Sequence, residues 1–362
     1  MSNLSESSLP VPRVAGAVPV PVHVHVLKPA SKPLPPPAKA VVRPRVAAGG
    51  ASFGVAELML LLVAAVWGSS YAFAKQATQQ LPVLEFLALR FGLTFVLLLP
   101  ALKPLFNGQA RQGLRIGGVL GANLLAVFVC ETFGVSLTTA SNAAFLISLC
   151  VAFTPLVEWW MFGQRPASRM FWAAGLSVLG AALLSLTSAT ETAVGWGDAL
   201  MLLAAVLRAV MVCLTRRLTR QDEGPGQPAP PSLPALTLTA LQAGVVALGA
   251  GALATVGHVA HGQPWPALPL QAAFWWPMAF LVLFCTVFAF FAQNYAAART
   301  APSRVSLLMG SEPVFGALFA VYWLGEVVSG WGWLGGLLIV VAAWWVTMPR
   351  AVKAPLHTEK SL

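Results

Sequence analysis

Long apolar runs separated by short polar, glycine- or proline-containing stretches fill the chain from residue 53 to residue 348. A helix needs about 20 apolar residues to cross the hydrocarbon core of a bilayer. Ten segments fit this length: 55–75, 83–101, 116–136, 141–162, 170–189, 197–217, 235–256, 273–295, 303–324 and 331–348. Their continuous apolar character differs from the short alternating pattern of membrane β-strands. The pattern therefore predicts an all-α membrane protein with ten transmembrane helices.

The two ends of the chain have a different composition. Proline, valine and alanine dominate residues 1–52, which carry six basic residues and show neither helical nor strand periodicity. Such a composition is typical of disordered segments. Prolines and basic residues interrupt every apolar run before Phe53, so no cleaved signal peptide is expected. We expect residues 1–52 to form a disordered basic cytoplasmic tail and residues 349–362 a short cytoplasmic tail.

Composition excludes a sizeable soluble domain. Hydrophobic residues make up 57% of the chain, charged residues 9%, and the mean hydropathy is +0.75, whereas about a quarter of a soluble domain is charged. The formal net charge of +10 would favour nucleic acid as a partner of a soluble protein, but in a membrane protein basic residues mark the cytoplasmic side. We expect the lipid bilayer and no nucleic acid as a partner. The four cysteines lie in apolar runs without metal-site spacing, so neither a metal nor a cofactor is expected.

The basic residues also predict the orientation of the chain. All but three of the 22 lysines and arginines lie in the tails, or in or beside every second loop; the exceptions are Lys75, Arg90 and Arg208. The other loops contain no lysine or arginine. This alternation follows the positive-inside rule. It predicts a multi-pass protein of the cytoplasmic (inner) membrane with both termini in the cytoplasm.

Cysteines introduced at residue 20 or residue 358 test this orientation. In intact cells they are expected to resist a membrane-impermeant thiol reagent, and to react only after the membrane is opened. Labelling of either position from outside would refute the predicted topology.

The two halves of the apolar region resemble each other. With an offset of 162 residues, the stretch around Gly163 aligns with the stretch around Gly325; identities include Thr138/Thr300, Ser141/Ser303, Phe153/Phe315 and Leu176/Leu338. Because each half has five predicted helices, an odd number, the second half would lie upside down. Inverted repeats are typical of transporters, with the binding site near the midplane. Pro155 and Pro313 do not align, which predicts that the halves differ in where this helix breaks.

Several sequence stretches resemble one known family. They are WGSSYAFAK (67–75), LALR (87–90), ETFGVSLTTASNAAFL (131–146), AQNYAAARTAPSR (292–304), SEPVF (311–315) and LGE (324–326). On these stretches the chain is similar to the drug/metabolite transporter superfamily, of the type with two EamA domains. The resemblance covers residues 55–348 and implies EamA repeats at 53–190 and 196–348. It also implies a secondary carrier that exports amino acids or other small metabolites. Gln164 departs from the family pattern, which has glutamate there.

Charges within the predicted helices are the best candidates for a binding site. A charge at bilayer depth costs about 2.5–3.5 kcal/mol on insertion scales, so it faces a cavity or a partner. The deep charges are Lys75, Arg90, Glu131, Arg208 and Glu312.

The first half supplies most candidate substrate-binding residues. Trp67, Tyr71 and Lys75 are four residues apart and share one helix face, with Ser70 beside them. This face is expected to form a cavity wall; the alternative is a packed interface with an aromatic belt. Polar residues that include Asn142 follow Glu131 at the next helix junction. Glu131 is expected to bind a substrate ammonium or exchange a proton; the alternative is an internal ion pair with Lys75 or Arg90.

In the second half, Glu312 precedes Pro313, which removes one backbone donor and frees the carbonyl group near Met309. A break of this kind commonly borders the cavity of a carrier. Gln293 and Asn294 lie near the inner end of their helix, where they either line a vestibule or form hydrogen bonds within the protein.

The pattern as a whole favours a carrier over an enzyme. No Walker-type loop is present, so a proton or substrate gradient would supply the energy. No histidine lies in a predicted helix and no nucleophile–base constellation is recognisable, so no catalytic residues are assigned. An intramembrane enzyme and a lipid-scrambling or structural protein are the alternatives. A homodimer is left open.

Overall fold

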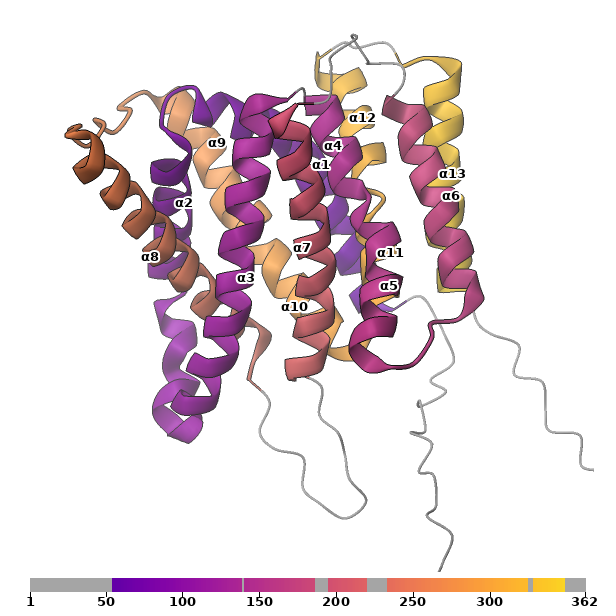
Figure 1. Ribbon diagram of the computed structural model, residues 1–362, viewed down its shortest axis with the longest axis horizontal. Coiled ribbons are helices and arrows are strands. Elements are labelled where there is room, and N and C mark those ends of the chain that lie inside the picture. The colour runs from indigo at the N-terminus through magenta and orange to yellow at the C-terminus, as the bar shows by residue number, and fades with distance from the viewer. Residues whose placement is uncertain (1–53, 139, 186–194, 220–232, 325–327, 349–362) are drawn as a thin grey trace, which may run out of the picture. The chain divides into compact units, whose positions relative to one another are not determined.

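A computed structural model of the chain describes residues 54–138, 140–185, 195–219, 233–324 and 328–348. The expected tails, 1–52 and 349–362, lie outside the described residues. The described part is helical and contains no strand, as the apolar pattern predicts. Its α-helices are α1 (Val55–Thr78), α2 (Val83–Leu97), α3 (Ala110–Leu137), α4 (Ala140–Ser148), α5 (Cys150–Phe162), α6 (Ser168–Ser185), α7 (Trp196–Thr219), α8 (Ala235–His261), α9 (Ala272–Val282), α10 (Ala289–Arg299), α11 (Pro302–Met309), α12 (Glu312–Leu324) and α13 (Gly330–Thr347) (Figure 1).

Three short segments of tighter or wider helix complete the list. A 3₁₀ turn at Leu99–Leu102 and a π-helical turn at Leu105–Gln109 connect α2 to α3. A second π-helical stretch, Leu283–Phe288, joins α9 to α10. Seven stretches of the described residues are long and apolar enough to span a membrane: 55–78, 110–137, 143–162, 196–219, 235–261, 272–299 and 330–347. Length and composition thus support a multi-pass membrane protein, while ten spans stay a prediction.

Helices that are far apart in sequence pack side by side. α3 runs along α7, α2 along α8 and α6 along α13. α1 lies against α9 and α10 on one side and against α11 and α12 on another, and α7 contacts both α4 and α5. α1 therefore packs mainly against helices of the second half, and α7 mainly against helices of the first half.

A close crossing holds α1 against α12. An added Cβ at Gly68 would lie 2.5 Å from the Glu312 carbonyl oxygen and 2.7 Å from the Gly316 nitrogen. Because both are backbone atoms, only glycine at position 68 allows this approach. The crossing fixes the neighbouring Trp67 and Tyr71 relative to the beginning of α12.

Two helices are interrupted at matching positions. α4 ends at Ser148 and α5 begins at Cys150, whereas α11 ends at Met309 and α12 begins at Glu312. With the offset of 162 residues, Leu149 corresponds to Ser311, so the prediction that the halves break in different places is wrong. A proline weakens the whole preceding turn, through its missing N–H and its clash with the carbonyl four residues earlier. Pro313 clashes with the carbonyl of Met309, the last residue of α11, whereas Pro155 lies inside α5, six residues after Leu149. The position of the proline therefore accounts for the break in the second half but not for the break in the first.

Candidate functional site

An ionic cluster lies where α3, α7 and α12 meet. The Arg208 guanidinium of α7 contacts two carboxylates: Nη2 is 3.2 Å from both oxygens of Glu131 in α3, and Nη1 is 3.3 Å from Oε2 of Glu312 in α12. All three side chains are largely buried, with exposed fractions of 13%, 11% and 6%. A buried charge is retained at reasonable cost only when it is paired. The cluster holds one cation between two anions.

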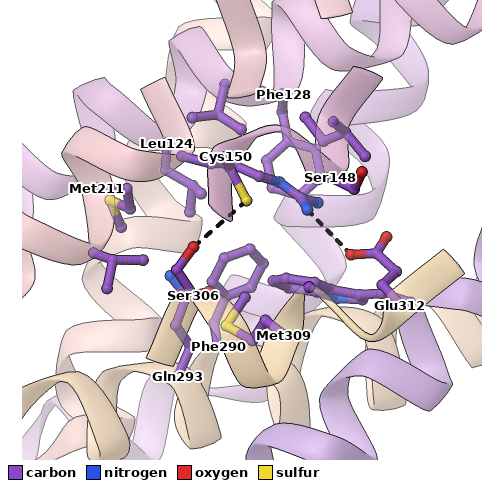
Figure 2. Close-up of a pocket in the computed structure, with 16 residues that line it drawn as sticks. Leu124, Phe128, Ser148, Cys150, Met211, Phe290, Gln293, Ser306, Met309 and Glu312 are labelled. Atoms are coloured by element: carbon purple, nitrogen blue, oxygen red, sulfur yellow. Dashed lines mark hydrogen bonds and ion pairs between the residues drawn. The ribbon is translucent and has the colours of Figure 1, made fainter. Parts of the chain in front are cut away.

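Two aromatic residues of α1 complete this cluster. The Tyr71 hydroxyl donates a hydrogen bond to Oε1 of Glu312. The Arg208 guanidinium carbon lies 4.7 Å from the centroid of the Trp67 ring, within the range of a cation–π interaction. Together Trp67, Tyr71, Glu131 and Glu312 surround Arg208, and we call this arrangement the Arg208 cage. Figure 2 shows the Glu312 carboxylate and its ion pair at one end of a pocket.

The π-helical stretch between α9 and α10 positions the residues beside the cage. Wider winding frees backbone groups from the usual helical ladder. The Cys285 carbonyl accepts a hydrogen bond from Trp67 Nε1 at 2.9 Å, and the Thr286 hydroxyl accepts one from Arg90 Nε at 2.9 Å. The Arg90 guanidinium carbon also lies 5.3 Å from the centroid of the Phe128 ring. One irregular turn thus orients both the Trp67 indole and a buried arginine.

Two pockets share the cage as a common wall. Trp67, Phe128, Arg208 and Glu312 line both. The first, which we call the Arg90 pocket, is also lined by Ser70, Tyr71, Thr78, Arg90, Glu131 and Thr132, among others. The second, the Gln293 pocket, extends between α3, α7, α10 and α11 to Ser148, Cys150, Gln293 and Ser306 (Figure 2). A molecule in either pocket would contact the Arg208 cage.

Most of the predicted site residues meet here. Trp67, Ser70, Tyr71, Arg90, Glu131 and Glu312 line the Arg90 pocket, and Gln293 lines the Gln293 pocket. Asn294 instead lies between α10 and α8, where its Nδ2 donates to Gln242 Oε1 at 2.7 Å and to Thr239 Oγ1 at 3.1 Å. Lys75 and Asn142 lie in α1 and α4, but their side chains are outside the described residues.

Sequence reasoning missed the central role of Arg208. It identified this residue as a deep charge but gave Glu131 a different internal partner, Lys75 or Arg90. Among the described residues Glu131 pairs with Arg208, and Arg90 bonds to Thr286. The position of Arg208 in its helix could have indicated this role. Arg208 lies at the middle of the 24-residue helix α7, where a charge is most costly. The described residues contain no group of three or more His, Cys, Asp or Glu placed to hold a metal ion.

Comparison with known proteins assigns the chain to a family. The model of the EamA-like transporter family matches the chain twice, at residues 54–186 and 195–348. The chain belongs to this family. It is therefore a multi-pass membrane transporter of the drug/metabolite transporter superfamily, with two EamA segments. Glu131 comes from the first segment, and Arg208 and Glu312 come from the second, so the cage joins them.

Relatives of this EamA-like transporter share its length more than its sequence. Two proteins of Archaeoglobus fulgidus, each described as an uncharacterized transporter, are 26% and 25% identical to it. The alignments cover 79% and 80% of this chain and 84% and 96% of theirs. A solved crystal structure with 20% sequence identity superimposes with a TM-score of 0.62, covering 81% of this chain and 96% of the other. This last likeness supports the fold alone.

Proposed function

We propose that this EamA-like transporter is a secondary active exporter of amino acids or related small metabolites that works by alternating access in the cytoplasmic membrane. In this proposal, ten spans form two inverted five-helix repeats, 53–190 and 196–348. The observation that carries it is the Arg208 cage, which draws its charges from both EamA segments at the wall between two pockets. Charged residues facing a cavity between repeats are typical of carrier binding sites.

The helix pairings support the inverted repeat. If α4–α5, α9–α10 and α11–α12 count as one span each, the first half runs α1, α2, α3, α4–α5, α6 and the second half runs α7, α8, α9–α10, α11–α12, α13. The spans at the same place in the two halves are counterparts, so α7 is the counterpart of α1 and α9–α10 is the counterpart of α3. If each span is replaced by its counterpart, the contact of α3 with α7 becomes a contact of α9–α10 with α1, and the structure contains both. The same replacement turns the contact of α1 with α11–α12 into that of α7 with α4–α5, and leaves the α2–α8 and α6–α13 pairs unchanged. A pseudo-two-fold relation produces such an exchange.

Contacts at the proposed cytoplasmic end link the halves in a way that alternating access would have to undo. Glu158 of α5 accepts hydrogen bonds from the Ser303 hydroxyl and, at 2.9 Å, from the Ser303 backbone N–H at the start of α11. Arg304 Nη2 lies 3.1 Å from Oε1 of Glu57 in the first turn of α1. These contacts hold the N-terminus of α11 to the first half. Opening toward the cytoplasm would break them.

A charged cage suits a charged solute. Glu131 Oε2 is buried and has no hydrogen-bond partner among the described residues, although it lies within ion-pair distance of Arg208. Two carboxylates face one guanidinium, so an ammonium group could pair with the second carboxylate. Arg208 and Arg90 line the same pocket and offer cations to a carboxylate. An amino acid carries both groups.

Replacing Glu131 with glutamine tests the carrier assignment. The substitution retains volume and hydrogen bonding but removes one charge, and it leaves Arg208 paired with Glu312. Counterflow of an amino-acid and metabolite panel into proteoliposomes is expected to fall at least tenfold, with the apparent melting temperature nearly unchanged.

The matched control is Glu85→Gln. Glu85 Oε1 lies 2.6 Å from His258 Nε2, and neither residue lines either pocket, so normal flux is expected. Wild-type flux in the Glu131→Gln variant would overturn the site. A wild-type protein that moves no solute across the whole panel, while hydrolysing or scrambling lipid, would overturn the carrier itself.

A further inference from the structure

The part of the Gln293 pocket beyond the cage is mainly apolar. Its walls come from α3, α4, α7, α10 and α11, and include Leu124, Phe128, Ile147, Met211, Phe290 and Met309. Figure 2 shows Gln293 and Glu312 at opposite ends of this pocket, with Phe290 and Met309 between them in this view. A ligand that contacts both ends must therefore have an apolar middle.

The polar groups that line the pocket outside the cage differ in whether they already have partners. The Ser148 hydroxyl donates to the Phe145 carbonyl oxygen at 2.6 Å, and the Ser306 hydroxyl accepts from Thr154 Oγ1 at 2.9 Å. Gln293 is only 4% exposed, and its Oε1 has no hydrogen-bond partner in the part of the chain that the structure describes. Buried polar groups without partners are rare in folded proteins and call for a specific explanation.

The neighbouring amide differs from Gln293 in its surroundings. Asn294, the next residue, is 2% exposed, yet its amide nitrogen bonds to both Gln242 and Thr239 across the α8–α10 interface. Asn294 Oδ1 and Gln242 Nε2 also have no hydrogen-bond partner among the described residues. What distinguishes Gln293 is that its amide lines a pocket, whereas these two amides lie in the interface between α8 and α10. The end of a glutamine side chain offers a donor or an acceptor, according to the rotation of its amide.

Helix geometry sets the length of the apolar middle. Arg208 and Val212 both line the pocket on α7, and four residues of α-helix rise about 6 Å. On α10 the pocket runs from Phe290 to Gln293, a rise of about 4.5 Å. The apolar region is thus on the order of one helical turn long, the length of a phenyl ring and its linking carbon. The cavity between its walls is about 30 Å³, so a ring enters only when the walls move apart.

We propose that the Gln293 pocket is a subsite for the far end of an amphipathic substrate: an apolar body of ring size that ends in an uncharged hydrogen-bonding group, received by the Gln293 amide. The charged end lies in the Arg208 cage, so the proposal rests on the proposed carrier function and narrows its substrate class. Tyrosine and tyramine have the required shape. Phenylalanine and phenethylamine lack only the terminal hydroxyl group.

The test measures binding of these four compounds to purified full-length protein by calorimetry. In the wild type, each hydroxylated compound is expected to bind about tenfold more tightly than its partner without the hydroxyl, the effect of roughly one hydrogen bond. In the Gln293→Leu variant this ratio is expected to fall to about one, with phenylalanine binding retained. Comparing amino acids with amines shows whether the substrate carboxylate contributes.

The matched control is Gln242→Leu, which removes a buried amide that lines neither pocket. It is expected to lower the melting temperature and keep the tenfold ratio. If the wild type binds both members of each pair equally, or none of the four, the subsite is refuted, whatever other solute the protein carries. If the Gln293-dependent ratio appears but no solute crosses proteoliposomes, the subsite stands and the carrier function fails.

Discussion

Replacing Arg208 with methionine is expected to abolish transport and to lower the free energy of unfolding by about 3–5 kcal/mol, because it leaves two buried carboxylates without their cation. Glu131 and Glu312 both pair with this one guanidinium, so no other single substitution in the cage leaves as much uncompensated charge. Arg208→Lys retains the charge but not the fork that reaches two carboxylates, and intermediate values are expected. Proteoliposome flux and thermal unfolding in detergent measure the two effects.

A triple variant separates stability from transport. Combining Arg208→Met with Glu131→Gln and Glu312→Gln removes all three charges, and is expected to recover most of the lost stability while transport stays absent. An Arg208→Met variant with wild-type melting temperature and flux would show that the ion pairs contribute to neither property.

Gly68→Ala is expected to disrupt the site through the backbone. The added Cβ would lie 2.5 Å from the Glu312 carbonyl oxygen, so α1 and α12 must separate, at a cost of about 1–3 kcal/mol for overpacking. Separation also moves Trp67 and Tyr71 away from Glu312, and flux is expected to fall at least tenfold. Melting temperature and flux are measured as above.

Gly92→Ala provides the matched control for this prediction. Gly92 lies within α2, and an added Cβ there would have no atom within 4 Å. Because alanine favours a helix over glycine by about 1 kcal/mol, this variant is expected to be as stable as the wild type or slightly more so. Equal behaviour of the two variants would contradict the proposed crossing.

The sequence indicates how deep in the membrane each residue of a predicted helix lies, but it does not indicate which helices are neighbours. Apolar length predicted a helical membrane protein, and the four-residue spacing of Trp67 and Tyr71 correctly placed them on one face of α1. The partners of Arg208 could not be found in this way, because Glu131 and Glu312 are 77 and 104 residues away in the chain. Only the packing of α7 against α3, and of α1 against α12, brings these groups together.

The same limit explains the two amides of α10. Gln293 and Asn294 are adjacent and equally polar, so the sequence left the same two roles open for both, the lining of a vestibule or hydrogen bonds within the protein. A helix turns about 100° per residue, which directs one amide into a pocket and the other toward α8. The helix breaks were misplaced because they were predicted from the prolines, whereas the first-half break at Leu149 lies six residues before Pro155, beyond the turn that this proline disrupts.

The origin of the cage charges in both segments has a consequence for biogenesis. Because the ribosome delivers the chain from its N-terminus, Glu131 reaches the bilayer before Arg208 has been synthesised. Until α7 arrives, α3 carries a carboxylate at bilayer depth without the partner it has in the folded protein, an arrangement that costs about 2.5–3.5 kcal/mol on insertion scales. When α7 arrives, Arg208 already finds Glu131 as a partner, and Glu312, synthesised 104 residues later, finds Arg208 in place. Stable retention of α3 by the insertion machinery is therefore expected to depend on synthesis continuing through α7.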